Sequence, residues 1–340
     1  MQFLYVLTSK PNDFYYEQFL LSAVSLKLLM PDAYITLLCD LKTRDTLTGK
    51  RIEYKKYISK IIFEKAPEDL LQLEVSRWLR TSMRRLTKGD FLFIDGDTII
   101  TEDLTSVFNK NIIFGACLDS HIPISYHSNR DRFIQGNKLL GFNSHISDKQ
   151  YNGGVLYCAD NPQTKKIFDR WHELWLYSKS KNIIRDQPSL NMAIYENSSF
   201  FTELDGIWNC QLVSNYLPYL SNAKIIHYFS TNLHLYPSAY LLASEDVLKK
   251  IKKTGIIDTK TLDLLKNPKA AFVTNTRVYT GQDMLYVLDS DIFKFLFFLR
   301  KKVPILFKYL NGLSSMFKKV IKSYMVKNSK KKDGGIKYYN

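Results

Sequence analysis

Short apolar runs alternate with longer amphipathic segments over residues 1–100, and this alternation constrains the fold more than any other feature of the chain. The apolar runs have the length and composition of buried strands, and the segments between them have helical spacing. Strands are predicted at 3–8, 33–39, 60–64 and 90–95, and helices at 13–31, 43–50 and 68–87. Strands that alternate with helices form mostly parallel sheets with helices on both faces. The sequence therefore predicts an α/β fold.

The alternation continues with less regularity toward residue 230. Further strands are predicted at 112–119, 151–158 and 222–230, and further helices at 161–179 and 186–196. Residues 120–150 are polar with weak periodicity, so we expect a long loop that serves as a functional lid. The histidines of this loop are expected to be solvated rather than metal ligands: His121, His127 and His145.

Bulk composition limits the class of protein. A chain of 340 residues with 45% hydrophobic residues can bury one sizeable core. Its four cysteines show no CxxC spacing, which favours buried thiols and a reducing compartment over disulfides. The start, MQFLYVLTSKPNDF, lacks the features of a secretory signal, and no apolar run reaches 18 residues. We therefore expect a cytoplasmic protein without a transmembrane helix.

The positive charge is concentrated at the C-terminus. Residues 291–340 hold 13 Lys and Arg against two Asp, and so carry +11 of the net +15. Apolar side chains there fall within an arc of roughly 100° at helical pitch, with lysines opposite. The apolar set is Leu306, Leu310, Leu313, Phe317, Val320, Ile321 and Tyr324, and the basic set is Lys308, Lys318, Lys319 and Lys322. This pattern predicts a basic amphipathic helix that associates with an anionic membrane surface.

Two alternatives exist for this tail. A packed terminal helix with a solvated basic face gives the same pattern. A nucleic-acid-binding tail is disfavoured, because the large apolar residues would have no role there.

The stretch FLFIDGDTII places Asp95 and Asp97 at the end of an apolar strand. Open α/β sheets bind ligands beyond the carboxyl ends of their strands. Three interpretations follow from these residues. The stretch is a capping turn, or a phosphatase motif with Asp95 as nucleophile, or a metal site that neutralises the diphosphate of a nucleotide-sugar. A metal such as Mn²⁺ would also accept a histidine ligand.

Five segments in order, FLFIDGDTII, YNGGVLYC, RDQPSLN, LDGIWNCQ and IIHYFS, resemble those of family 8 glycosyltransferases. The similarity covers about residues 1–230. It implies a GT-A fold, which is a Rossmann-like, mostly parallel sheet flanked by helices, here with a helical basic C-terminal tail. It also implies a metal-dependent enzyme that moves a hexose from a UDP-sugar with retention of configuration.

The resemblance also implies residue roles. Asp95, Asp97 and His227 would bind Mn²⁺ or Mg²⁺, and Asp186 and Gln187 would act at the reacting sugar. The implied contacts to the nucleotide-sugar are Val6, Leu7, Thr8, Arg77, Arg80, Asp95, Gly96, Asp97, Asn152, Gly153, Trp208 and Asn209. The choice between Arg77 and Arg80 stays open. Other readings of these residues are a helix cap at Asp186, a core position for Trp208 and a simple turn at 152–154.

The chain departs from the family pattern after His227. It reads HYFSTNLHLYP and lacks a Gly-x-x-Lys-Pro-Trp segment, so the basic tail is a candidate for the missing phosphate contact. We expect three parts: a GT-A domain at 1–235, a helical extension at 236–290 and a membrane-associating tail at 291–340.

The expected acceptor is a glycan or lipid-linked glycan of bacterial surface polysaccharide (lipopolysaccharide or capsule), at the inner membrane face. No nucleic-acid partner is expected. The alternatives are a haloacid-dehalogenase-like phosphatase and a non-catalytic, membrane-bound GT-A-like module.

Overall fold

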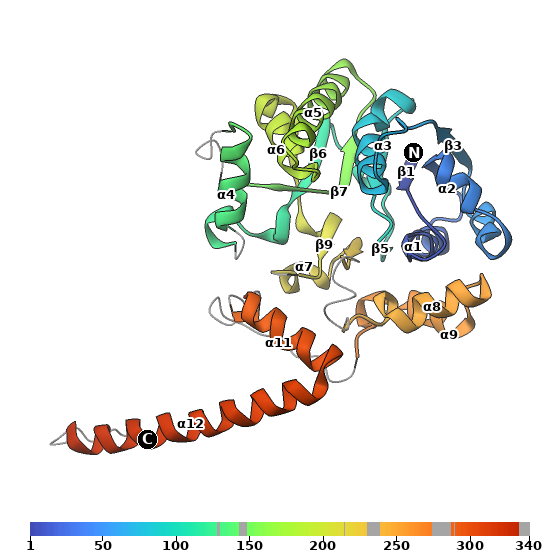
Figure 1. Cartoon of the computed structure of the whole chain (residues 1–340). Helices are drawn as coiled ribbons and strands as arrows, with labels where there is room; N and C mark the ends of the chain where they lie inside the picture. The colour runs from blue at the N-terminus through green and yellow to red at the C-terminus, as the bar shows by residue number, and fades with distance from the viewer. Residues whose placement is uncertain are drawn as a thin grey trace. The chain divides into compact units, whose positions relative to one another are not determined.

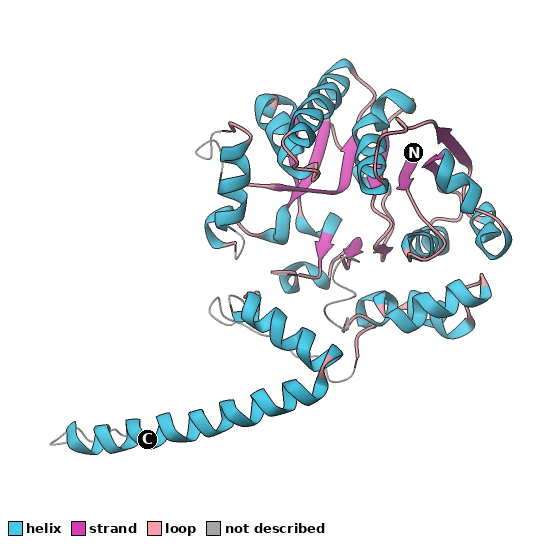
Figure 2. Ribbon diagram, in the orientation of Figure 1, coloured by secondary structure: helices cyan, strands magenta, loops and turns pink. Residues whose placement is uncertain are grey.

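The computed structural model describes residues 1–127, 130–142, 148–213, 215–229, 239–273, 287–288 and 290–332, with all side chains among these except 132 and 319–332. The chain divides into two compact units, residues 1–277 and 278–340. The larger unit holds two sheets and most of the helices (Figures 1 and 2).

The main sheet of the larger unit is almost entirely parallel. Its strands are β1 (Gln2–Leu7), β2 (Tyr34–Asp40), β3 (Lys60–Glu64), β4 (Phe91–Ile94), β6 (Phe114–Leu118), β7 (Tyr151–Cys158) and β8 (Phe201–Leu204). Their spatial order is β3-β2-β1-β4-β7-β6-β8. Only β7 runs against its neighbours, β4 and β6. The start of β7 therefore lies at the same edge as the carboxyl ends of β1 and β4.

Alternate residues of the strands face opposite sides of the main sheet, and each side has its own core. Leu4, Phe91 and Phe93 belong to the side covered by α3 (Gln72–Leu86), α5 (Pro162–Ser180) and α6 (Gln187–Glu196). Phe3 and Leu92 belong to the opposite side, which is covered by α1 (Tyr15–Leu29). Residues 16–26 of α1 are all buried, because this helix is also covered on its outer side.

A second, three-stranded sheet lies beside α1. It consists of β5 (Thr98–Ile100), β9 (Cys210–Gln211) and β10 (Ile225–His227). β10 is the central strand and pairs antiparallel with β5 and parallel with β9. Its antiparallel register sets His227 opposite Thr98, directly after the Asp95–Asp97 turn.

A buried chain of hydroxyl groups holds the Asp95–Asp97 turn in place. Thr98 Oγ1 donates to the carbonyl of Asp95 at 2.8 Å, and Ser22 Oγ lies 2.7 Å from Thr98 Oγ1. Tyr5 Oη lies 3.0 Å from Ser22 Oγ. Each hydroxyl has one hydrogen, so the direction is set: Tyr5 donates to Ser22, and Ser22 donates to Thr98. The turn is thereby tied to α1 and β1.

The other α-helices among the described residues of the larger unit have ten residues or fewer. They are α2 (Leu41–Thr46), α4 (Arg130–Leu139), α7 (Leu217–Leu220), α8 (Glu245–Thr254) and α9 (Thr259–Lys266). The extension around α8 packs on α1 within this unit. All four cysteines are free and buried, as predicted.

The smaller unit contains α11 (Asp291–Lys302) and α12 (Pro304–Lys332), so the prediction of a helical tail is confirmed. Several large apolar side chains of these helices are exposed, among them Phe295, Ile305 and Phe317. The side chains of Lys319, Val320, Ile321, Lys322 and Tyr324 lie outside the described residues. Among the described helices, none has both the length and the apolarity that crossing a membrane requires.

The predicted strands and helices of the first 200 residues are present, with shifts at their ends. The expectation of a loop at 120–150 is wrong in part, because α4 lies within it. His121 is also not solvated: it is 6% exposed, and its ring packs 4.4 Å from that of Tyr219. His127 bonds Ser120, and His145 lies outside the described residues.

We predict that His121 makes stability depend on pH. Burial lowers the pKa of His121 from 6.5 to about 4, and Asp205 opposes this only partly. Between these two pH values the unfolded chain binds a proton that the folded chain excludes, so stability falls as the pH drops through this window. The loss should approach about 3 kcal/mol. Urea unfolding at several pH values measures it.

The control for this prediction is His121→Gln, which removes the ionisable group. Its stability should fall less steeply over the same window than that of the wild type. Equal slopes for the two proteins would contradict the assignment.

Candidate active site

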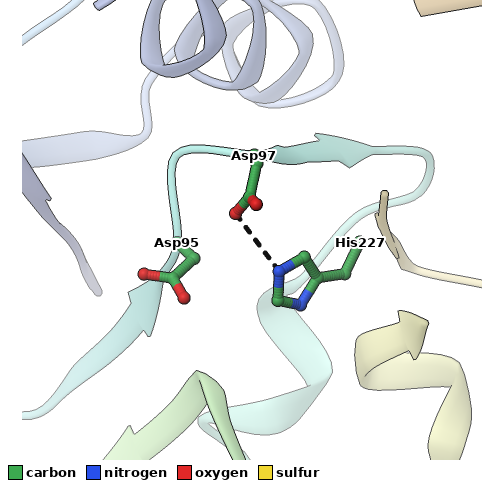
Figure 3. A group of neighbouring side chains, drawn as sticks. All are labelled: Asp95, Asp97 and His227. Atoms are coloured by element: carbon green, nitrogen blue, oxygen red, sulfur yellow. Dashed lines mark ion pairs between the residues drawn. The ribbon is translucent and has the colours of Figure 1, made fainter. Parts of the chain in front are cut away.

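Asp95, Asp97 and His227 converge at the carboxyl edge of the main sheet. One potential ligand atom from each lies within 4.8 Å of the others (Figure 3). Asp95 follows β4, Asp97 precedes β5, and His227 ends β10. Nε2 of His227 lies 3.2 Å from Oδ1 of Asp97. Two carboxylates and an imidazole are a donor set that suits a divalent ion such as Mn²⁺ or Mg²⁺.

The pKa shifts of Asp95 and His227 show that negative charge in this cluster is not fully compensated. Burial raises the pKa of Asp95, and the charge of Asp97 raises it further. Arg80 and His227 lower this pKa, but it stays above its ordinary value. Burial by itself lowers the pKa of His227, but Asp97 and Asp95 reverse that, so this pKa is also raised. The two aspartates thus destabilise each other's charge, and a bound divalent ion would relieve that repulsion.

Two arginines on one face of α3 reach into the same region. Arg77 and Arg80 are three residues apart, and therefore neighbours on the helix surface. Nε of Arg77 lies 3.2 Å from Oδ1 of Asp186, and Nε of Arg80 lies 3.6 Å from Oδ2. Arg80 Nη1 is also 3.8 Å from Oδ2 of Asp95. Both arginines therefore lie beside Asp186, and both stay predicted contacts of the nucleotide-sugar.

Asp186 precedes α6 but does not cap it with its side chain. Its Oδ2 atom is buried and accepts no hydrogen bond from the described residues, and the Nε groups of Arg77 and Arg80 likewise lack acceptors. Ion pairing without hydrogen bonds leaves these polar atoms incompletely satisfied. The hydrogen-bonding capacity of these atoms is therefore not fully used among the described residues.

Residues 152–154 lie within β7, so the reading of a simple turn is wrong, and the two glycines there allow close approach. A Cβ on Gly153 would lie 2.7 Å from Nη2 of Arg80, which donates to the Gly153 carbonyl at 2.5 Å. A Cβ on Gly154 would lie 2.8 Å from Nδ1 of His227. Each glycine therefore admits one functional side chain. The side chain of Asn152 is buried and bonded to Asp119, Gly154 and Asn209.

The other predicted residues lie around this centre. Val6 and Leu7 end β1, and Thr8 follows them at the same edge. Gly96 lies between the two aspartates, in contact with Phe19. Gln187 is the first residue of α6 and half-buried. Trp208 is 1% exposed in the core, with the ammonium groups of Lys110 and Lys224 over its ring.

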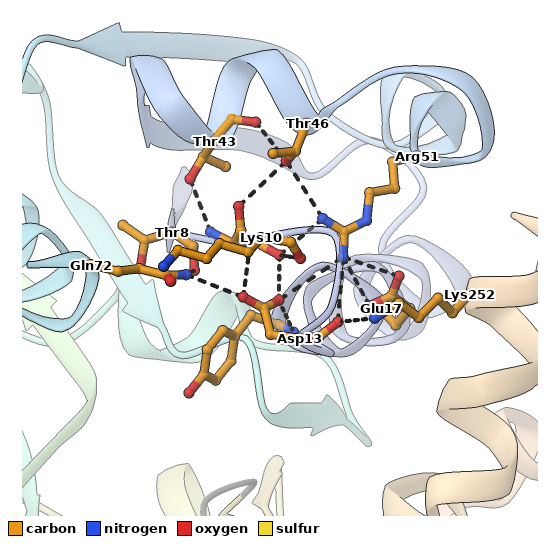
Figure 4. Close-up of polar contacts among 11 residues, drawn as sticks. Thr8, Lys10, Asp13, Glu17, Thr43, Thr46, Arg51, Gln72 and Lys252 are labelled. Carbon is orange, nitrogen blue, oxygen red and sulfur yellow. Dashed lines mark hydrogen bonds and ion pairs between the residues drawn. The ribbon is translucent and has the colours of Figure 1, made fainter.

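A polar network holds the loop after β1, where Thr8 lies (Figure 4). Asp13 accepts hydrogen bonds from the backbone of Lys10 and the side chain of Ser9, both at 2.6 Å. Gln72 of α3 adds a third hydrogen bond to Asp13, at 3.1 Å. The loop is therefore held in one conformation against α3.

Two cations brace the other side of this loop. Arg51 lies 3.4 Å from the buried carboxylate of Glu17, and Lys252 of α8 donates to the Asp13 carbonyl at 2.6 Å. Burial raises the pKa of Glu17, although Arg51 opposes this. The C-terminal extension thus contributes a residue to the loop at the end of β1, a contact that the sequence did not reveal.

Sequence analysis missed three further residues at the centre. Gly154 lies against His227, and the ring of Phe229 stacks on His227 at a centroid distance of 4.1 Å. Asp119, after β6, accepts from Asn152 at 2.8 Å. The second Gly of the pair and an acid at a strand end were visible signals, whereas the stacking of Phe229 was not.

Comparisons with known proteins bear on the family and the fold. The model of the family described as "Glycosyl transferase family 8" matches residues 42–232, which is more than half of the chain. A comparison with curated protein sequences finds no match.

Several solved structures are similar in fold. The galactosyltransferase LgtC, in complex with donor and acceptor sugar analogs, aligns with a TM-score of 0.50 and 12% identity over 77% of this chain and 99% of that one. Mouse xyloside xylosyltransferase 1 aligns with a TM-score of 0.46 and 14% identity over 67% of this chain and 98% of that one. GlyE of Streptococcus pneumoniae TIGR4 aligns with a TM-score of 0.46 and 15% identity over 82% of this chain and 66% of that one. At these identities, the likeness to LgtC bears on the fold alone.

Replacement of Gly154 by Ala tests the geometry of the cluster. The added methyl group would displace the ring of His227, so we expect Mn²⁺ affinity to fall at least about 10-fold. Overpacking should also reduce stability by about 1–3 kcal/mol. Calorimetric Mn²⁺ titration and urea unfolding measure the two effects.

The matched control is Gly136→Ala in α4, where an added Cβ meets nothing within 4 Å. It should keep the Mn²⁺ affinity and be neutral or slightly stabilising, by up to about 1 kcal/mol. Similar metal affinities in the two variants would contradict the proposed packing of His227.

Proposed function

The chain belongs to glycosyl transferase family 8, and from that premise we propose that it transfers a hexose from a UDP-sugar, with a divalent metal bound by Asp95, Asp97 and His227. The observation that carries the proposal is the convergence of these three side chains at the carboxyl edge of the sheet. Mn²⁺ or Mg²⁺ held there would neutralise charge on the departing diphosphate. The family assignment makes the protein a glycosyltransferase and sets aside the phosphatase and the non-catalytic module.

The proposal assigns Asp186 to the donor sugar. Its buried Oδ2 atom accepts no hydrogen bond from the described residues, and a sugar hydroxyl would supply one. Arg77 and Arg80 pair with the carboxylate and hold it in place. Gln187 follows at the first position of α6, where its side chain is predicted to lie near the anomeric carbon.

The remaining donor contacts are proposed from their positions. Val6, Leu7 and Thr8 at the end of β1 would meet the nucleoside, on the loop that Arg51 and Lys252 brace. Gly96 would give the diphosphate access to the backbone between the two aspartates. Asn152, Gly153, Trp208 and Asn209 are proposed to line the sugar pocket; Trp208 and Asn209 are buried, so they would support it from behind.

Most of the rate enhancement would come from positioning and electrostatics. Asp95, Asp97 and His227, which would hold the metal, and the cations Arg77 and Arg80 are already in place where negative charge would develop on the departing diphosphate. The enzyme would hold the acceptor hydroxyl against the anomeric carbon. A bimolecular reaction step then becomes effectively unimolecular, which lowers its entropic cost. We propose retention of configuration, with a glycan or lipid-linked glycan of bacterial surface polysaccharide as the acceptor.

The donor proposal is tested with a panel of UDP-sugars and Mn²⁺. The wild type should release UDP from at least one of them, by transfer or slow hydrolysis. Asp97→Asn should lower that rate by about 100-fold or more, because it removes a charged metal ligand. Asp263→Asn, which changes a surface carboxylate on α9, should keep the full rate. Phosphatase activity without any UDP release would contradict the proposal.

We propose that the tail of residues 291–340 binds the cytoplasmic face of a membrane. Exposed apolar side chains on α11 and α12 alternate with basic residues, and each lysine or arginine near an anionic leaflet contributes about 1 kcal/mol. This tail would form the third part of a protein whose other parts are the GT-A domain at 1–235 and the extension at 236–290. It would keep the enzyme near a lipid-linked acceptor.

Co-sedimentation of the full chain with lipid vesicles tests this. Binding should be stronger to vesicles with phosphatidylglycerol than to phosphatidylcholine alone. A variant with four basic residues of α11 and α12 changed to Gln should lose this preference: Arg300, Lys301, Lys302 and Lys308. The control changes four lysines of α8 and α9 to Gln: Lys249, Lys253, Lys260 and Lys266. Equal binding by both variants would refute a specific role for the tail.

A further inference from the structure

His227 is held in a single orientation by groups that are not metal ligands. Its Nδ1 atom lies 3.0 Å from Oδ1 of Asn209, and its ring stacks on Phe229 with an interplanar angle of 9°. Gly154 leaves no room for a side chain beside the ring. The imidazole is thus fixed by contacts on its Nδ1 side, while Nε2 points to Asp97.

Hydrogen bonds behind His227 determine which nitrogen carries the proton. Gly154 N–H donates to Oδ1 of Asn152 at 2.8 Å, and a backbone N–H can only donate. Nδ2 of Asn152 donates to the carboxylate of Asp119 at 2.8 Å, and a carboxylate can only accept. The amide of Asn152 therefore has one orientation, set at both ends by groups with a single role.

The same reasoning continues to the imidazole. Oδ1 of Asn152 also faces Asn209 at 3.0 Å, so Asn209 must present its NH₂ group there. The Oδ1 atom of Asn209 then faces Nδ1 of His227 and accepts from it. Asn209 therefore requires a proton on Nδ1 of His227. Asp97 also can only accept, and it lies 3.2 Å from Nε2, so it competes for that proton when no cation is present. With a cation at Nε2, or without the charge of Asp97, the neutral ring would carry its proton on Nδ1.

Asp119 begins a segment of unusual backbone geometry. Ser120 and His121 have φ of 54° and 57°, in the left-handed region that residues other than glycine seldom adopt. The segment is held by Gln211, whose Oε1 accepts from the Ser120 N–H at 2.9 Å and whose own N–H donates to His121 Nε2 at 3.1 Å. Such conformations persist where surrounding contacts enforce them, and they cluster at functional sites.

We propose that Asp119, Asn152 and Asn209 are positioning residues that fix the tautomer and direction of His227 as a metal ligand. These three residues and His227 form what we call the amide chain. The role in metal binding rests on the proposed function, whereas the hydrogen bond between Nδ1 and Asn209 does not depend on it. Groups behind a metal-bound histidine set its tautomer and strengthen metal binding in this way.

The test compares variants of the full chain by calorimetric Mn²⁺ titration. Asn209→Ala should weaken Mn²⁺ binding about 10- to 100-fold. Asp119→Ala should weaken it less, and Asp119→Asn should stay near the wild type, because an amide oxygen can still accept from Asn152. The matched control is Asn197→Ala, which removes a buried asparagine whose amide donates to the Ala193 carbonyl. It should leave Mn²⁺ affinity unchanged.

A second readout needs no metal. It uses ¹⁵N-histidine-labelled Asp97→Asn protein, which lacks the competing carboxylate beside Nε2. There the neutral His227 ring should carry its proton on Nδ1. Comparison with the corresponding His227→Gln protein assigns that signal among the six histidines of the chain. In the same Asp97→Asn background the Nδ1 preference should be lost with Asn209→Ala, reduced with Asp119→Ala and retained with Asp119→Asn and Asn197→Ala.

The outcomes separate the two proposals. An Nδ1 tautomer in Asp97→Asn, together with a wild type that does not bind Mn²⁺, overturns the metal-dependent function and supports the orienting role of the amide chain. An Asp97→Asn protein with the proton on Nε2, or variants of Asn209 and Asp119 with unchanged tautomer and unchanged Mn²⁺ affinity, overturns the inference.

Discussion

The antiparallel pairing of β10 with β5 is the contact on which the site depends. It places His227 opposite Thr98, so that a histidine far along the chain meets the turn that carries Asp95 and Asp97. The Tyr228 N–H extends the pairing to the Asp97 carbonyl, at 3.1 Å. Because the turn is also tied to α1 through the buried hydroxyls, neither partner can shift without loss of several buried hydrogen bonds. Backbone geometry, rather than attraction between the side chains, brings the charges together.

The basic groups around Asp95 and Asp97 partly balance the charge of the two carboxylates. Two carboxylates in a partly buried turn oppose each other's ionisation, and the nearby cations on α3 offset this only in part. Arg80 serves both Asp95 and Asp186, while Arg77 serves Asp186. Their hydrogen-bonding capacity is not used up by these ion pairs. An incompletely satisfied buried network costs stability, which is the physical reason to regard it as prepared for a ligand.

Much of this was accessible from the sequence, and the exceptions have physical causes. The strands around Leu4 and Phe93 are apolar on both faces, which is the pattern of a sheet covered on both sides. Asp95, Asp97 and His227 each follow or end an apolar run, so their convergence could be anticipated. Strands β5 and β9 are too short to be recognised from sequence, and α4 has too weak a helical period. The antiparallel direction of β7 leaves no mark in its apolar pattern. The burial of His121 depends on Gln211 and Tyr219, which are distant in sequence.

The paired glycines show why residue roles were harder to predict than residue positions. Sequence alone suggested that missing side chains at 152–154 let a sugar approach the backbone. In the structure the space beside Gly153 is occupied by Arg80, and the space beside Gly154 by His227. One short stretch of β7 thus admits both the arginine that pairs with Asp95 and the imidazole that faces Asp97. Because both side chains are packed against the same backbone, a change at either glycine would displace Arg80 or His227 and so disturb the cluster of Asp95, Asp97 and His227.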